Sequence, residues 1–205
     1  KWLISKALER LQAANEGGQQ FDEIDSDELG QMVLALRRFG LGVRGLRYDL
    51  KEKEPLVQWE DSEGCEWTPF YALSDGQQSF IGMVADIARR ASLLNPHLGA
   101  HAIDESPGII LIDEIDLHLH PDWQRKAIRG LTKAFPKMQF FVTTHSPIVV
   151  SEVDPSSLIL LDFSGGSRVV RRSNQSIGLD SSYILKHILG SESRPETSRA
   201  KLAKI

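Results

Sequence analysis

The stretch GIILIDEID, residues 108–116, decides the fold. Its four consecutive apolar residues, 109–112, do not alternate with polar ones, which is typical of a strand buried on both faces of a parallel sheet. Asp113 and Glu114 follow at the carboxyl end of that strand, where open α/β sheets bind their ligands. A strand that merely ends in solvated acids has the same pattern, so the neighbouring motifs have to decide between the two interpretations.

The sequence around this strand alternates between helix and strand patterns. A helix is expected over residues 74–94, ended by Asn95-Pro96, and another over residues 122–135. Further short strands are expected over residues 140–142, 158–161 and 168–170. This order predicts an α/β fold in which neighbouring strands are parallel and the crossovers right-handed.

The first third of the chain reads differently. Helical spacing covers residues 1–12, and a second helix is expected over residues 26–39 with Ser26 as its N-cap. Residues 43–68 alternate as short strands around turn residues, which predicts an antiparallel hairpin or meander. The last residues, 191–205, are rich in Ser, Arg and Glu and are expected to be an exposed end.

The composition narrows the class of protein. With 41% hydrophobic and 25% charged residues and a net charge of −4, the chain resembles an ordinary soluble globular protein. Its single cysteine, Cys65, forms no internal disulfide, which favours a reducing cytoplasm. No apolar run reaches the ~18 residues of a membrane helix, and no signal peptide is visible. We therefore expect a cytoplasmic protein without a membrane partner.

The second motif, LSDGQQ over residues 73–78, opens the first long helix. Ser74 is its natural N-cap, and Gly76 lets the backbone come close to a phosphate. The free N–H groups of a first helical turn attract anions. An ordinary capped helix is the alternative interpretation.

The third motif, FFVTTHSP over residues 140–147, ends a strand in two threonines and a histidine. His145 could hydrogen-bond a γ-phosphate or an attacking water. A partly buried structural histidine is the alternative.

The three motifs in this order resemble the nucleotide-binding domain of ABC-type ATPases. They are closer to the soluble branch, which holds the RecF, structural-maintenance-of-chromosomes and overcoming-lysogenization-defect ATPases. LSDGQQSFIGMVADIARRASLLNP, DEIDLHLHP and TTHSP look most like the ATPase subunit of Septu-type and retron-associated anti-phage defence systems. The resemblance is strong over residues 71–162. It implies the C-terminal half of an ABC ATPase head, with a parallel-sheet core and flanking helices, preceded by a helical and antiparallel β segment.

The resemblance also implies site residues and domains. Glu114 would be the catalytic base, His145 the switch histidine, and Asp113 the Walker B aspartate that holds Mg²⁺ through water. The signature loop, which reaches ATP on a partner subunit, would be Ser74, Gly76 and Gln77, and the D-loop at the dimer interface Asp116, Leu117 and His118. Asp75 departs from the glycine of transporter-type signatures. The expected division is a helical and β-hairpin segment over 1–70, the ATPase core over 71–190 and a truncated end over 191–205.

The motif G-x-x-x-x-G-K-[ST] of a phosphate-binding P-loop is absent from the chain. Because the P-loop of this family precedes the signature, and because the chain begins at Lys1, we expect a piece that starts downstream of it. Such a piece should not bind ATP in the usual way by itself.

Two further patterns leave alternatives open. His118 and His120 form an H-x-H pair that suits a metal, although no third ligand stands nearby in the sequence. The other pattern is a set of basic residues that suits either nucleic acid or solvent: Arg89, Arg90, Arg168, Arg171 and Arg172.

The sequence thus predicts a Mg²⁺-dependent ATP hydrolase that works as a homodimer and switches an anti-phage defence complex. The expected partner is an effector nuclease of the HNH type, with a reverse transcriptase and its nucleic acid as further candidates. A DNA-repair or chromosome-maintenance ATPase that clamps DNA is the alternative, and a scaffold that does not hydrolyse ATP is a third.

Overall fold

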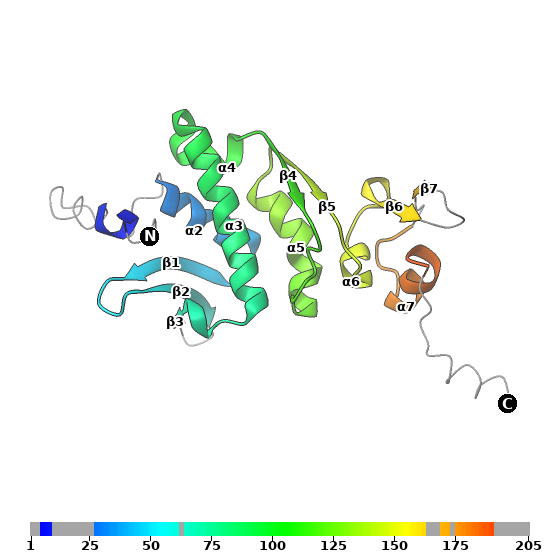
Figure 1. The fold of residues 1–205 in the computed structure, drawn as a ribbon, viewed down its shortest axis with the longest axis horizontal. Coiled ribbons are helices and arrows are strands. Elements are labelled where there is room, and N and C mark those ends of the chain that lie inside the picture. The colour runs from blue at the N-terminus through cyan, green and yellow to red at the C-terminus, as the bar shows by residue number, and fades with distance from the viewer. Residues whose placement is uncertain (1–4, 10–26, 62–63, 163–168, 173–174, 191–205) are drawn as a thin grey trace. The chain divides into compact units, whose positions relative to one another are not determined.

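The structure is a computed structural model that describes residues 5–9, 27–61, 64–162, 169–172 and 175–190 (Figure 1). The chain divides into two compact units, which we describe separately. The first comprises Lys1–Ile112 and Leu117–Phe141, and the second comprises Asp113–Asp116 and Val142–Ile205.

The first unit contains an antiparallel meander with strands β1 (Val43–Asp49), β2 (Glu54–Asp61) and β3 (Gly64–Pro69). In the central strand, Val57 is fully buried and pairs with Leu46 on one side and Thr68 on the other. The antiparallel β segment predicted over residues 43–68 is confirmed.

The N-cap of helix α2 (Glu28–Phe39) lies one residue later than expected. Its N-cap is Asp27, whose Oδ1 accepts a hydrogen bond of 2.8 Å from the backbone N–H of Gly30. The prediction of Ser26 as the cap is therefore wrong, and Ser26 itself lies outside the described residues. A carboxylate satisfies the free N–H groups as a hydroxyl does and adds a favourable charge at the positive end of the helix. The helix ends at Gly40, which has φ = +86°.

Two longer helices pack on α2: α3 (Asp75–Leu94) and α5 (Pro121–Ala134). Ser74 caps α3 as predicted, and His120 caps α5. The first unit also contains three short elements: η1 (Phe70–Ala72), η2 (Pro96–His101) and α4 (Ala102–Glu105).

Aromatic rings hold these helices and the meander together. The Phe39 and Phe80 rings meet edge to face with centroids 4.9 Å apart, and Trp123 lies 6.1 Å from Phe80 and 6.3 Å from Trp59. Gly130 gives α5 its close approach to α2, because a Cβ built there would stand 2.5 Å from the Phe39 ring. The core of the first unit is therefore packed too tightly at this point to accept one more methyl group.

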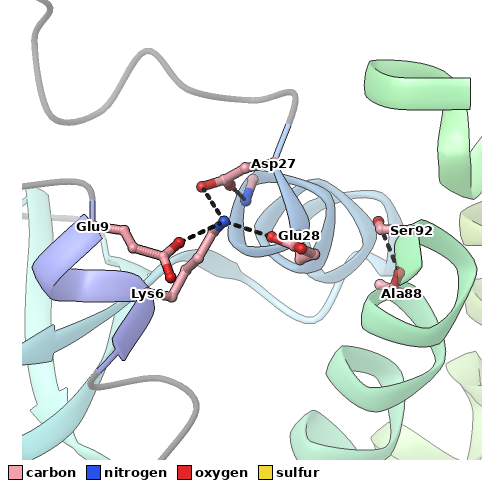
Figure 2. A network of polar contacts seen from close by, with 7 residues as sticks. Lys6, Glu9, Asp27, Glu28, Ala88 and Ser92 are labelled. Atoms are coloured by element: carbon pink, nitrogen blue, oxygen red, sulfur yellow. Dashed lines mark hydrogen bonds and ion pairs between the residues drawn. The ribbon is translucent and has the colours of Figure 1, made fainter. Parts of the chain in front are cut away.

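An ion-pair cluster ties the helical segment over residues 5–9 to the start of α2 (Figure 2). The ammonium nitrogen of Lys6 lies 2.7 Å from Oε2 of Glu28, 3.2 Å from Oε2 of Glu9 and 3.7 Å from Oδ2 of Asp27. Burial acts to lower the pKa of Lys6, but its acidic neighbours outweigh that effect and raise the pKa. Burial likewise acts to raise the pKa of Glu28, and Lys6 more than offsets it, so that pKa is lowered.

Strands β4 (Gly108–Ile112) and β5 (Met138–Val142) pair in parallel. The prediction that β4 is buried on both faces is wrong for this chain. Ile109 and Leu111 are 65% and 81% exposed, and Phe141 in β5 is 48% exposed. One face of this two-stranded sheet is thus apolar and open.

The second unit contains α6 (Pro147–Val150), β6 (Ile159–Asp162), β7 (Val169–Arg172) and α7 (Ser181–Tyr183). Two short helical turns complete it: η3 (Pro155–Ser157) and η5 (Ile184–Ile188). β6 pairs with β7 in antiparallel fashion.

Within the part of the chain that the structure describes, no helix is both long and apolar enough to cross a membrane. The domain boundaries expected at residues 70 and 190 stay a prediction.

Candidate functional site

Thr143 connects the two acids that follow β4. Its hydroxyl donates a hydrogen bond to Oδ1 of Asp113 and accepts one of 2.8 Å from the backbone N–H of Glu114. Its carbonyl accepts a third from the N–H of Ile115 at 3.1 Å. The segment after β5 therefore fixes both the carboxylate of Asp113 and the backbone of Glu114.

Thr144 does the same for the next acid. Its hydroxyl donates to Oδ1 of Asp116 and accepts from the backbone N–H of Ser146 at 3.0 Å. Ser146 in turn caps α6, with its Oγ accepting from the N–H groups of Ile148 and Val149 at 3.1 and 3.4 Å. The chain around His145 is thereby held on both sides.

Glu114 and His145 are both exposed, and both belong to the second unit. Glu114 has φ = +49°, a left-handed conformation that a non-glycine residue adopts at some cost in energy. Among the described residues, none forms a hydrogen bond with the imidazole of His145. The two side chains are therefore available to a ligand.

The predicted signature loop is a reciprocal capping box at the start of α3. Oγ of Ser74 accepts from the N–H of Gln77 at 3.3 Å, and Oε1 of Gln77 accepts from the N–H of Ser74 at 3.0 Å. Nε2 of Gln78 closes the preceding turn on the carbonyl of Leu73 at 2.8 Å. The start of α3 and the turn before it are thus held by hydrogen bonds within the loop itself.

Gly76 presses this loop against the segment predicted as the D-loop. A Cβ at Gly76 would stand 2.0 Å from the carbonyl oxygen of His118, which itself has φ = +59°. Beside the contact lies a hollow of about 250 Å³, lined by Ser74, Gly76, Gln77, His118, Leu119, His120 and Trp123. Of the other predicted D-loop residues, Leu117 is exposed in the first unit, and Asp116 belongs to the second.

The residues at the end of β4 suit a hard cation. Mg²⁺ is commonly held by one or two carboxylates together with water and phosphate oxygens. Asp113 is exposed and uses Oδ1 for Thr143, so its other oxygen can face an ion or an ion-bound water. No group of three or more His, Cys, Asp or Glu side chains that could hold a metal occurs among the described residues.

The histidine pair has a structural use for one member. Nδ1 of His120 accepts a hydrogen bond of 3.3 Å from the N–H of Asp122, which makes His120 the cap of α5.

The structure describes the side chains of only some of the basic residues that the sequence suggested for nucleic-acid binding. Arg90 donates to Oδ2 of Asp86 at 2.6 Å, whereas Arg168 and the side chains of Arg171 and Arg172 lie outside the described parts.

Sequence reasoning did not assign the roles of Thr143 and Thr144. The sequence did contain a signal for these roles. Thr143 and Thr144 end a strand that comes after the strand ending in acids, and hydroxyls there can donate hydrogen bonds to those carboxylates if the two strands are neighbours. The hydrogen bond between Thr143 and Asp113 requires β4 and β5 to be neighbours, and sequence spacing alone did not establish that pairing.

A parallel strand pair, a capped helix with a close glycine approach and an acid cluster braced by hydroxyls define an α/β domain of the ATPase type. The chain belongs to the family described as "AAA domain, putative AbiEii toxin, Type IV TA system", whose model matches residues 5–151.

Three curated relatives carry names that agree with this family. A "Retron Ec83 probable ATPase" of Escherichia coli is 42% identical over 95% of this chain and 34% of its own length. A "Retron Vc95 probable ATPase" of Vibrio cholerae serotype O1 biovar El Tor is 44% identical over 45% of this chain and 18% of its own. A "Septu protein PtuA" of Bacillus thuringiensis is 38% identical over 45% and 23%. The chain thus spans about a third of the E. coli relative's length.

A solved structure has the same fold. A chain from a study titled "Structural biochemistry of ATP-driven dimerization and DNA stimulated activation of SMC ATPases" aligns with a TM-score of 0.51 at 14% identity. The alignment covers 88% of this chain and 96% of that one. At this identity the likeness shows the fold alone, and it confirms the predicted fold.

Proposed function

We propose that these residues contribute to an ATPase site in which Glu114 is the general base for the attacking water. The observation that carries the proposal is the double hydrogen bond of Thr143, which fixes Asp113 and the Glu114 backbone in one arrangement. A positioned, exposed carboxylate is suited to accept a proton from water. Phosphoryl transfer asks mainly for positioning and for compensation of negative charge.

Asp113 would hold Mg²⁺ through water, and the ion when bound neutralises charge on the phosphates. The Thr143 hydroxyl keeps Oδ1 of Asp113 in place, so the carboxylate needs no reorientation when ATP arrives. His145, next to the Thr144 brace, would hydrogen-bond the γ-phosphate or the attacking water. A P-loop has to come from other residues, since these 205 contain none.

The signature loop of Ser74, Gly76 and Gln77 would meet the ATP of a second subunit. Ser74 and Asp75 at the positive end of the α3 dipole are exposed, so that this end is accessible to a phosphate. The predicted D-loop of Asp116, Leu117 and His118 would reach the same interface, and Gly76 ties His118 to the signature loop. We propose on this basis that the protein forms an ATP-dependent homodimer.

The names of the relatives support a place in anti-phage defence. Retron and Septu proteins both match the chain, and a shared ATPase in such systems is suited to act as a nucleotide-dependent switch. We propose that ATP state controls an effector nuclease of the HNH type in the cytoplasm, with a reverse transcriptase and its nucleic acid as further partners. A partner responds to ATP only if it binds the two states with different affinity.

The test is Glu114→Gln in the full-length protein, with Glu105→Gln as the matched control, because Glu105 is an exposed acid of α4. We expect Glu114→Gln to lower kcat by ~10²–10⁴ while leaving ATP binding intact. The variant should accumulate as an ATP-bound dimer on size-exclusion chromatography. Hydrolysis at the wild-type rate, or an equal loss in the control, would show that Glu114 is not the base.

A further inference from the structure

Helix α5 carries a basic surface that the ATPase site does not use. Five exposed basic residues occupy this helix and the turn after it: Arg125, Lys126, Arg129, Lys133 and Lys137. We call these residues the α5 basic face. The chain as a whole has a net charge of −4, so the α5 basic face is a positively charged surface on a negatively charged chain.

The packing of α5 fixes where this face points. Ala127, Leu131 and Ala134 are buried, and Gly130 is pressed against the Phe39 ring. At 3.6 residues per turn, the four basic residues within the helix fall in an arc of roughly 100° on the opposite side. The helix cannot rotate these charges away without exposing its apolar residues and breaking the contact of Gly130.

The arrangement works against the stability of the helix. Arg125, Arg129 and Lys133 follow one another at four-residue spacing, and like charges at that spacing cost about 0.2–0.5 kcal/mol per pair. Among the described residues, Lys126, Lys133 and Lys137 form no ion pair. The one acid of α5, Asp122, sits in the first turn near Nδ1 of His120. Stability of the fold therefore does not explain the three lysines of the α5 basic face.

We propose that the α5 basic face binds the phosphate backbone of a nucleic-acid duplex without regard to base sequence. From Arg125 to Lys133 the face is about 12 Å long at 1.5 Å per residue. That length spans three to four phosphates of one strand at about 3.4 Å of helix axis each. Lysine and arginine side chains on a rigid helix can match such a row as separate point contacts.

The chemistry of the face favours nucleic acid over a protein. Protein interfaces are centred on apolar or aromatic side chains and are poor in lysine. The exposed neutral side chains between Arg125 and Lys137 are those of Thr132 and Pro136, and the Thr132 hydroxyl donates to the carbonyls of Ile128 and Arg129. The face also has no aromatic ring on which an unpaired base could stack, so duplex backbone fits better than single strands.

The experiment replaces the three lysines by glutamine, K126Q/K133Q/K137Q, in the full-length protein. Glutamine keeps helix propensity, and these lysines hold no ion pair among the described residues that the change would break. The matched control, K51Q/K53Q/K186Q, removes the same charge from exposed lysines elsewhere. The probe is a fluorescein-labelled DNA duplex of about 20 bp, titrated by anisotropy between about 50 and 200 mM salt.

A plot of log affinity against log salt has a negative slope, and we expect the α5 variant to make it shallower. The slope should change by about 0.9 per lost contact, or about 2.7 in all. Wild-type affinity should then fall about 40-fold more than that of the variant across this fourfold range of salt. The control should keep the wild-type slope, and basal ATP hydrolysis should be unchanged in both variants.

The proposal is overturned if the wild type does not bind the duplex at low salt, or if control and α5 variant weaken equally. It is also overturned if DNA binding survives and the α5 variant instead loses a co-purifying acidic protein. None of these results bears on hydrolysis, because the α5 basic face is independent of Glu114 and Asp113.

Discussion

The hydroxyl of Thr143 donates a hydrogen bond to the Oδ1 atom of Asp113, joining the ends of β5 and β4. Because the hydroxyl oxygen of Thr143 also accepts a hydrogen bond from the backbone N–H of Glu114, this one side chain sets the positions of two acids. Thr143 is therefore a positioning residue for the proposed site.

Replacing Thr143 by valine should lower kcat for ATP by about 10–100-fold, since small misplacements of reacting groups carry losses of that size. The free energy of unfolding should change by less than about 1 kcal/mol, because Thr143, Asp113 and Glu114 are exposed and water can replace the lost bonds. Steady-state kinetics and urea unfolding provide the two measurements. Thr143→Ser keeps the hydroxyl and should recover most of the rate; a serine variant as slow as the valine one would argue against the hydroxyl.

Gly76→Ala should disrupt the signature loop and the predicted D-loop together. The added Cβ would meet the His118 carbonyl at 2.0 Å, and a backbone atom cannot turn aside as a flexible side chain can. We expect destabilisation of about 1–3 kcal/mol and loss of ATP-dependent dimerisation. Gly82→Ala on the same helix has open space around it and should leave dimerisation unchanged. Normal dimers from Gly76→Ala would mean that the two loops can separate without consequence.

Gly130→Ala separates helix propensity from packing. Alanine is favoured over glycine inside a helix by about 1 kcal/mol, so propensity alone predicts stabilisation. The Phe39 ring, only 4% exposed and 2.5 Å from the new Cβ, predicts instead a net loss of about 1–3 kcal/mol. Thermal unfolding distinguishes the two outcomes, and a rise in Tm would show that α5 can shift away from α2.

Lys6→Met should destabilise the protein near neutral pH and much less in acid. The pKa of Glu28 is lowered in the folded state, so its contribution is present above its unfolded pKa and is lost as pH falls through the folded pKa. The raised pKa of Lys6 means that its own contribution persists until alkaline pH. Urea unfolding at about pH 7 and about pH 3 measures the difference between wild type and variant. A difference of equal size at both pH values would assign the effect to the methylenes of Lys6 rather than to its charge.

The strongly patterned elements could be predicted from the sequence. The meander, the Ser74-capped helix α3 and strands β4 and β5 lie where their periodicity placed them, to within a few residues. The cap of α2 could not be decided, because Ser26 and Asp27 both suit that position and only the chain's path selects one. The open face of β4 was not predicted. A run of apolar residues indicates that a strand is buried, but it does not show which segments would cover each face.

The candidate site was likewise only partly predictable from the sequence. The acids, the signature serine and the histidine were recognisable from residue type and order. The braces from Thr143 and Thr144 and the contact of Gly76 with His118 depend on which segments meet in space. The α5 basic face was also missed, because its charges are separated by buried residues and gather only when the helix is formed.

The open apolar face of β4 and β5 bears on how the protein survives in a cell. Leu111 is 81% exposed, and Ile109 and Phe141 of the same two strands are exposed as well. Chaperones bind apolar surface of this kind, and proteases reach it. Molecules in which this face stays bare would be cleared or would aggregate, and those in which it is covered would accumulate.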